Sequence, residues 1–310
     1  MKKINITIII VILALAGFYV GNKIVNNKPS VETPGNLSLH IVTSFYPMYF
    51  FASQIAGDKA DVYNVTPASA EPHDYEPTTQ DIARIENSNL LVLNGGKLEA
   101  WGDKVKDTLQ GSDVNVVTAG EGLADRTIEE EGKTIQDPHV WLDPILAKKE
   151  VAKITVALIA VDPKDTAYFQ KNEKVLNTKL DMLNQSYKIG LTSCQKKDIV
   201  TSHAAFGYLG AQYGLNQVAI SGVSPDEEPS AQKLAELADF VKKNDIKVIF
   251  FESLVSPKLS QTIANETGSQ TLVLDPIEGI PEEQLKQGEN YFTIMKQNLI
   301  NLQTALKCSK

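Results

Sequence analysis

Three of the four histidines in this chain lie in short segments that also hold prolines or carboxylates. His73 lies in Glu-Pro-His-Asp-Tyr-Glu-Pro, His139 in Asp-Pro-His-Val-Trp-Leu-Asp-Pro, and His203 in Thr-Ser-His-Ala-Ala-Phe. A fourth segment, Leu-Asp-Pro-Ile-Glu-Gly, adds Asp275 and Glu278. Three imidazoles and one carboxylate are typical ligands of a tetrahedral site for a borderline-soft divalent cation. These four segments therefore predict a metal site.

Each of these segments is expected at a place where ligands collect. His203 ends a predicted strand, Asp275 and Glu278 follow another, and His73 lies in a loop after a third. His139 lies in a loop before a predicted long helix. Because ligands of open α/β sheets bind at the carboxyl ends of strands, the four segments should converge on a cleft between two lobes.

The fourth ligand has two candidates. Asp275 is nearer the end of its predicted strand, whereas Glu278 has the longer side chain and precedes the flexible Gly279. The residues alone do not separate Asp275 from Glu278. Of the other polar candidates, Glu252 either orients a ligand imidazole as a hydrogen-bond acceptor or makes an ordinary loop bond. His40, inside the first predicted strand, is interpreted as structural, and Trp101 and Trp141 as packing residues.

Short apolar strands alternate with amphipathic helices along the chain, the pattern of an α/β fold with mainly parallel sheets. The pattern runs through 39–160, the predicted N-terminal lobe, and restarts in 193–310, the predicted C-terminal lobe. Predicted strands span 39–44, 61–65, 89–93, 115–117, 198–202, 217–220, 247–251 and 271–274. Predicted helices span 46–56, 79–87, 97–109, 205–213, 230–244, 257–267 and 291–306.

Residues 161–192 are predicted to form one helix that links the lobes. Pro163 suits the first helical position behind a capping Asp162, and no further Pro or Gly occurs before Ile189. An apolar stripe runs at helical spacing through Phe169, Leu176, Leu180, Leu183 and Tyr187. A helix of about 27 residues would be roughly 40 Å long, which suits a spine between two lobes.

The segment 120–136 has little apolar periodicity and contains three consecutive glutamates. It is predicted to be a mobile acidic surface loop, because runs of like charge are usually solvated. The alternative interpretation is a loop that gathers or shields cations near the site.

The composition and net charge of the chain limit the classes of partner that it could bind. The chain has 310 residues, 43% hydrophobic residues and a formal net charge of −8. Nucleic-acid binding is not expected, because it depends on Lys and Arg neutralising phosphates. The composition fits a globular exported protein. We expect the protein to act as a monomer.

The N-terminus predicts export. Lys2 and Lys3 precede an apolar run over 7–20, so residues 1–22 are expected to be a signal peptide or a membrane anchor, cleaved or retained. Residues 23–38 read as a flexible tether. No cysteine follows the run, so a lipoprotein anchor is not expected there. The predicted location is extracytoplasmic: periplasmic or at the cell surface.

The two cysteines, Cys194 and Cys308, are expected to form a disulfide because the chain is exported. This bond would link the C-terminal tail to the start of the second lobe. In the chain-entropy model it would stabilise the fold by about 4–5 kcal/mol. The alternative is a pair of buried free thiols.

From about Leu39 to Cys308 the chain resembles the metal-binding (cluster A-I) substrate-binding proteins of ABC transporters, closest to the zinc-uptake branch. The resemblance rests on the three histidine segments, continued after His203 by Ala-Ala-Phe-Gly-Tyr-Leu, and on Glu228-Pro229-Ser230. It implies two Rossmann-like lobes joined by a rigid helix, Zn²⁺ held between them, and delivery to a membrane permease. It carries His73, His139 and His203 over as ligands, and its Leu-Asn/Asp-Pro-x-Glu-Gly pattern favours Glu278 over Asp275.

Three alternatives follow from the same residues. A manganese or iron receptor of this family usually has a carboxylate at the position of His203, and manganese prefers oxygen ligands, so zinc is favoured. A zinc hydrolase would use the same ligands with a bound water, but the chain has no His-Glu-x-x-His segment. A surface adhesin would use the metal structurally. The chain also lacks the His-rich run that many zinc-branch members carry before the second ligand segment.

Overall fold

The computed structural model describes residues 39–130 and 132–309. The predicted signal or anchor (1–22) and tether (23–38) therefore lie outside the described residues. Within the described part, no helix combines the length and the apolar character needed to cross a membrane.

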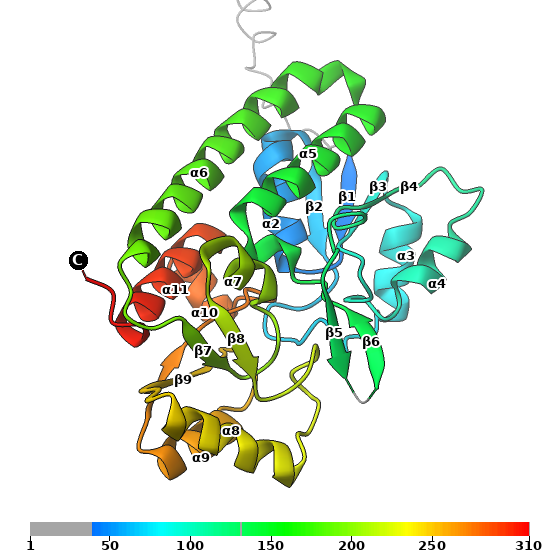
Figure 1. The fold of residues 1–310 in the computed structure, drawn as a ribbon. Coiled ribbons are helices and arrows are strands. Elements are labelled where there is room, and N and C mark those ends of the chain that lie inside the picture. The colour runs from blue at the N-terminus through cyan, green and yellow to red at the C-terminus, as the bar shows by residue number, and fades with distance from the viewer. Residues whose placement is uncertain (1–38, 131, 310) are drawn as a thin grey trace, which may run out of the picture. The chain divides into compact units, whose positions relative to one another are not determined.

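Two four-stranded parallel sheets form the framework (Figure 1). The N-terminal sheet has the order β2-β1-β3-β4 and the C-terminal sheet the order β10-β9-β7-β8. Their strands are β1 (His40–Thr43), β2 (Asp61–Asn64), β3 (Leu90–Leu93), β4 (Asn115–Thr118), β7 (Asp198–Thr201), β8 (Asn216–Ala219), β9 (Val248–Phe251) and β10 (Gln270–Val273). The α/β class with parallel sheets is confirmed, and each predicted strand is present with a shift of at most one residue at either end. The predicted lobe boundaries stay predictions.

The helices cover the sheets. They are α2 (Tyr46–Ala56), α3 (Thr79–Glu86), α4 (Gly102–Thr108), α5 (Pro144–Val161), α6 (Thr166–Thr192), α7 (Gly207–Tyr213), α8 (Ala231–Lys243), α9 (Lys258–Thr267), α10 (Glu282–Lys286) and α11 (Tyr291–Ala305). The sequence analysis missed α5 and α10. Helix α4 begins at Gly102 rather than at the predicted Lys97, because Lys97 and the two glycines before it have positive φ angles that no α-helix accepts.

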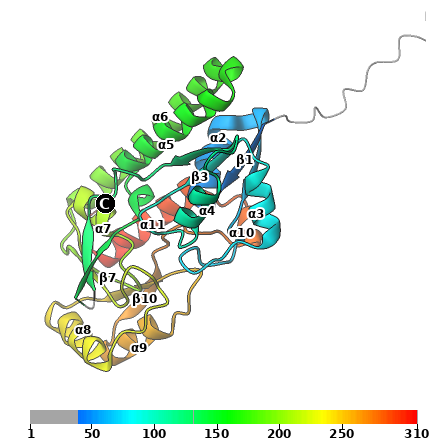
Figure 2. The same ribbon diagram turned by 90° about the vertical axis from the view of Figure 1, so that its right-hand side faces the viewer.

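Alternate residues of the strands face opposite layers, as parallel strands buried on both faces require. Val42 and Leu91 pack with Ile85 of α3 and Val105 of α4, whereas Ile41 lies in the main core with α2. Figure 2 shows α3 and α4 on the opposite side of this sheet from α5 and α6. The main core draws side chains from both halves of the chain and so joins the two sheets.

Helix α6 is the predicted spine, with a corrected start. It has 27 residues and buries the predicted stripe on helices α2, α5 and α11. It begins at Thr166, because Pro163–Asp165 form a 3-10 turn that follows the end of α5 at Val161. Asp162 makes no side-chain capping bond, so its predicted capping role was wrong.

The prediction of a loop without regular structure over 120–136 was also wrong, because most of this segment is a hairpin. β5 (Thr127–Glu130) pairs antiparallel with β6 (Lys133–Gln136), and Ile128 lies opposite Ile135. The turn between them contains Gly132 at φ 76°, a conformation that glycine adopts without strain. Two half-buried isoleucines and a turn glycine thus favour the hairpin in spite of the run of glutamates.

Glu150 of α5 is fully buried, and neither carboxylate oxygen has a hydrogen-bond partner among the described residues. Burial raises its pKa well above the ordinary 4.5, although Lys153 opposes the shift. The folded state therefore keeps a proton that the unfolded state loses above about pH 4.5, so folding stability should fall as pH rises above that value.

We expect Glu150→Gln to abolish this loss. Its free energy of unfolding should match that of the wild type near pH 4.5 and exceed it by about 1–3 kcal/mol at pH 8. Urea unfolding at both pH values measures the difference. A difference that is the same at both pH values would contradict the buried, protonated carboxyl.

Candidate metal centre

Four elements bring the predicted ligand residues together. His73 lies in the loop between β2 and α3, and His139 precedes the 3-10 turn Val140–Leu142 that leads into α5. His203 follows β7, and Glu278 follows β10. One ligand-type atom of each residue lies within 4.8 Å of the other three. The side chain of His73 is 7% exposed, and those of the other three residues are at most 1% exposed.

Four of the six separations between these atoms match a tetrahedral zinc ion. Glu278 Oε1 lies 3.2 Å from His139 Nε2, 3.4 Å from His203 Nε2 and 3.5 Å from His73 Nε2. The Nε2 atoms of His139 and His203 are 3.2 Å apart. Ligands about 2.0–2.1 Å from a tetrahedral zinc lie about 3.3–3.4 Å from one another. These four separations thus have the size expected in a zinc coordination shell, and all the ligand atoms lie within 4.8 Å of one another.

Two atoms of the cluster lack a hydrogen-bond partner. His73 Nε2 and Glu278 Oε1 are buried, and neither makes a hydrogen bond within the described part of the chain. Buried polar atoms are nearly always satisfied, so each such atom needs an explanation. A cation between the four residues would satisfy both atoms.

Two carboxylates orient two of the imidazoles from behind. Asp137 Oδ1 lies 2.8 Å from His139 Nδ1, and Glu252 Oε1 lies 2.8 Å from His203 Nδ1. Each also accepts the backbone N–H of its histidine, at 3.0 and 3.2 Å respectively. A carboxylate on Nδ1 leaves Nε2 free to bind a metal. The predicted hydrogen bond between Glu252 and a histidine ring is present, and its role in orienting a metal ligand stays a prediction.

The sequence analysis missed the role of Asp137, although it lies two residues before His139. It also missed Glu71, whose Oε1 accepts the backbone N–H of His73 at 3.2 Å. Burial and the nearby Glu278 carboxylate raise the pKa of Glu71 to about 9. Glu71 is therefore protonated at neutral pH and adds no further negative charge to the cluster.

The electrostatics of the cluster favour a negative Glu278. Burial alone would raise its pKa, but the charge of His203 and the close approach of the three imidazoles lower it well below 4.5. Burial lowers the pKa of His73. Burial also opposes protonation of His139 and His203, but Asp137 and Glu252, together with Glu278, outweigh it and raise both pKa values. Protons therefore compete with a cation for these imidazoles.

Asp275, the other candidate for the fourth ligand, lies outside the cluster. Its Oδ1 accepts the N–H of Ile277 at 2.7 Å, and its Oδ2 accepts the hydroxyl of Ser253. Ile277 has a φ of 61°, and the Asp275 bond holds this turn, which presents Glu278 to the histidines. Asp275 thus shapes the loop, and only Glu278 of the two reaches the cluster.

The remaining candidates have the structural roles predicted for them. The side chain of His40 is 52% exposed and lies 3.8 Å from Asp61, away from the cluster. Trp141 is fully buried and packs beside the His139 ring at a centroid distance of 5.2 Å. Its Nε1 donates to the carbonyl of Pro276 at 2.7 Å, and Tyr291 donates to the Trp141 carbonyl at 2.6 Å. The His139 segment is therefore fastened to the C-terminal half.

The family model described as zinc-uptake complex component A, periplasmic, matches residues 41–305. This chain belongs to that family. The match covers both sheets and all four residues of the cluster. Because the family is one of solute-binding proteins for zinc uptake, the zinc-hydrolase alternative is set aside.

Similar proteins include the high-affinity zinc uptake system protein ZnuA of Bacillus subtilis, which is 41% identical over 292 residues and 91% of each chain. The zinc-binding lipoprotein AdcA of Streptococcus pneumoniae is 44% identical over 272 residues. That match covers 84% of this chain and 54% of AdcA, so the chain spans about half the length of that relative.

Two solved structures share the fold. Zn(II)-bound AdcA from Streptococcus pneumoniae has a TM-score of 0.76 and 43% identity, covering 86% of this chain and 57% of that one. The laminin-binding adhesin Lmb from Streptococcus agalactiae has a TM-score of 0.79 and 36% identity, covering 86% and 99%. The fold is therefore shared by proteins named for zinc binding and by one named for adhesion.

Proposed function

We propose that this protein is an extracytoplasmic receptor that captures Zn²⁺ and delivers it to the membrane permease of an ABC importer. The ligands in this proposal are the Nε2 atoms of His73, His139 and His203 and Oε1 of Glu278. The observation that carries it is the convergence of these four atoms on a buried point, with Glu278 Oε1 between 3.2 and 3.5 Å from the three Nε2 atoms. Zinc is the cargo, and no bond of a substrate is broken.

The ligand set favours zinc over manganese. Three imidazoles and one carboxylate suit zinc, whereas manganese prefers a shell richer in oxygen. Two of the similar proteins, ZnuA of Bacillus subtilis and AdcA of Streptococcus pneumoniae, are named for zinc uptake or zinc binding, which supports the same choice. Metal competition tests it: chelator-stripped protein should bind one zinc that a hundredfold excess of manganese does not displace.

The cluster joins two parts of the chain, which suggests how the cargo is released. His73 and His139 precede α6, whereas His203 and Glu278 follow it. A displacement of one sheet relative to the other would remove at least one ligand from the ion. In our proposal, docking to the permease causes this displacement outside the cytoplasm, in agreement with the periplasmic family description and the predicted export signal.

Glu252→Gln tests the orienting carboxylate. We expect zinc affinity to fall about 10- to 100-fold, because the amide cannot hold the His203 ring as a charged acceptor. Glu252 has no place among the four ligand atoms, so the bound zinc should still number one per chain. Competition with a chelator of known affinity measures the change. An unchanged affinity would show that Glu252 does not tune the site.

Adhesion is a second candidate, favoured by the match to an adhesin. One solved relative is described as a bifunctional protein with adhesin and metal transporting activity. Binding to immobilised laminin, measured for the wild type and for a variant that has lost its zinc ligands, separates the two functions. Laminin binding that survives loss of the ligands would add adhesion, while zinc-dependent growth lost in the same variant would keep the receptor role.

A further inference from the structure

The root of the β5–β6 hairpin is attached to helix α7. The hydroxyl of Tyr208 donates to the carbonyl oxygen of Asp137 at 3.1 Å and accepts the backbone N–H of Arg126 at 3.0 Å. Asp137 also donates its N–H to the Arg126 carbonyl at 3.0 Å, which closes the hairpin. Figure 1 shows the hairpin beside β8 and α7. The hydroxyl of Tyr208, a residue that follows α6 in the sequence, thus holds the base of a hairpin that precedes α6.

This attachment ends at the metal cluster. Asp137 is the carboxylate that accepts from both the backbone N–H and the ring of His139. Tyr208 is 4% exposed, and its ring packs with Ala124 and Val140 in a small apolar cluster of its own. A shift of the Tyr208 hydroxyl would therefore move Asp137 and, through it, the His139 ring.

Arg126 supplies the positive charge at the same point. Its Nε lies 3.9 Å from Asp137 Oδ2, an atom that is buried and makes no hydrogen bond to any described residue. Its guanidinium lies 5.8 Å from the centre of the Tyr208 ring. At Gly207, an added Cβ would lie 2.6 Å from Asp137 Oδ2 and 2.9 Å from Arg126 Nε. Only glycine lets α7 approach this pair so closely.

Away from the Tyr208 hydroxyl, a cavity separates the hairpin from the C-terminal half. A cavity of about 870 Å³ lies between the hairpin and the C-terminal half, lined by Arg126, Ile128 and Asp137 on one side and by Gly207, Gln217 and Lys233 on the other. The hairpin is therefore not held by continuous packing along this boundary. The hydroxyl of Tyr208, the charge of Arg126 and the small apolar cluster contribute to the attachment at the root of the hairpin.

We propose that Tyr208 and Arg126 are positioning residues of the metal site. They hold Asp137, and through it His139, against the C-terminal half in the arrangement that retains the ion. Neither residue is among the four ligands; each acts through Asp137. The inference rests on the proposed function, because it assumes that the four-residue cluster binds zinc.

Tyr208→Phe tests the hydroxyl and keeps the ring in its apolar cluster. We expect zinc to dissociate about tenfold faster, as for loss of other groups that orient a metal ligand. Tyr213→Phe is the matched control, because Tyr213 lies in the same helix but donates to Asn184, at 3.2 Å, rather than to the hairpin. Zinc-loaded protein is mixed rapidly with excess chelator, and the thermal unfolding of each zinc-free variant is recorded.

The outcomes separate positioning from stability. Faster release in Tyr208→Phe alone supports the proposal, whereas equal release rates in the two Tyr→Phe variants overturn it, whatever their melting temperatures. If the wild type itself holds no zinc, the proposed function fails and not the attachment. Arg126→Gln, at a side chain 43% exposed, provides a variant that should fold normally. It should speed release about threefold, and Arg126→Lys should restore part of the loss; no effect of Arg126→Gln would remove Arg126 from the proposal.

Discussion

Replacing His203 by alanine is expected to weaken zinc binding by about a thousandfold. A four-ligand zinc site contributes about 10–16 kcal/mol of binding free energy, so an equal share is roughly 2.5–4 kcal/mol per ligand, and the upper value corresponds to a thousandfold change. His203 is fully buried between Glu252 and Glu278, and no other imidazole of the described chain is placed to substitute for it. Competition with a chelator of graded affinity measures the change in dissociation constant.

His40→Ala is the control for this variant. His40 is the remaining histidine of the chain, is half-exposed and lies outside the cluster, so its loss should leave zinc affinity unchanged. Glu278→Gln should behave like His203→Ala, because it removes the charge that faces all three Nε2 atoms. Wild-type affinity in His203→Ala would exclude the ligand set that we propose.

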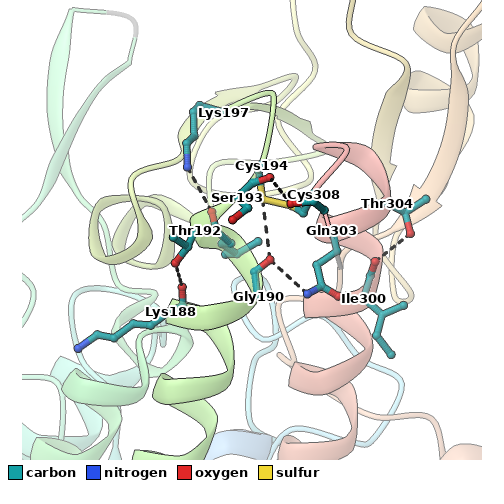
Figure 3. Close-up of a disulfide and its surroundings, with 12 residues drawn as sticks. Lys188, Gly190, Thr192, Ser193, Cys194, Lys197, Ile300, Gln303, Thr304 and Cys308 are labelled. Atoms are coloured by element: carbon teal, nitrogen blue, oxygen red, sulfur yellow. Dashed lines mark hydrogen bonds between the residues drawn. A yellow bond between two sulfur atoms is a disulfide. The ribbon is translucent and has the colours of Figure 1, made fainter.

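Loss of the disulfide is expected to cost about 4–5 kcal/mol of folding stability. Cys194 and Cys308 are bonded, as predicted, and lie 114 residues apart in the sequence. Figure 3 shows the bond joining the ends of α6 and α11. Closing so long a loop removes much of the conformational freedom of the unfolded chain, so the effect should lie mainly in the unfolded state. Urea unfolding of Cys194→Ser/Cys308→Ser measures it.

The native structure around the disulfide should survive its removal. Gln195 donates its N–H to the Leu306 carbonyl at 3.1 Å, and Ser309 donates to the Ser193 carbonyl at 3.2 Å, so backbone bonds also hold the two ends together. Zinc affinity should therefore be unchanged in the variants. Each single Cys→Ser variant should lose as much stability as the double variant, because either substitution removes the disulfide. A double variant as stable as the wild type would show that this loop closure contributes nothing.

Much of the fold was predictable, because its strongest signals are local. The strands are short apolar runs, and the stripe from Phe169 to Tyr187 has the helical period, so both were identified from spacing alone. The three histidines were identified because each lies in an unusual segment at a strand end or in a loop. Glu278 could not be separated from Asp275 by these rules, since the choice depends on the turn that Asp275 itself stabilises.

The missed features depend on contacts between distant segments. Helix α5 is rich in apolar residues, but Lys148, Lys149 and Lys153 interrupt them and Glu150 is buried, so its sequence shows no clear amphipathic period. The hairpin at 127–136 was hidden by its glutamates, although its paired isoleucines and Gly132 were a usable signal. The roles of Asp137 and Tyr208 require knowing that α7 lies against the hairpin root, and spacing in the sequence does not contain this information.

Diffraction at the zinc absorption edge from crystals of the zinc-loaded protein tests the central claim most directly. The account predicts one strong anomalous peak per chain, about 2.0–2.2 Å from the Nε2 atoms of His73, His139 and His203 and from one oxygen of Glu278. A peak at another place, or an ion that leaves any of these four residues unbound, would contradict it.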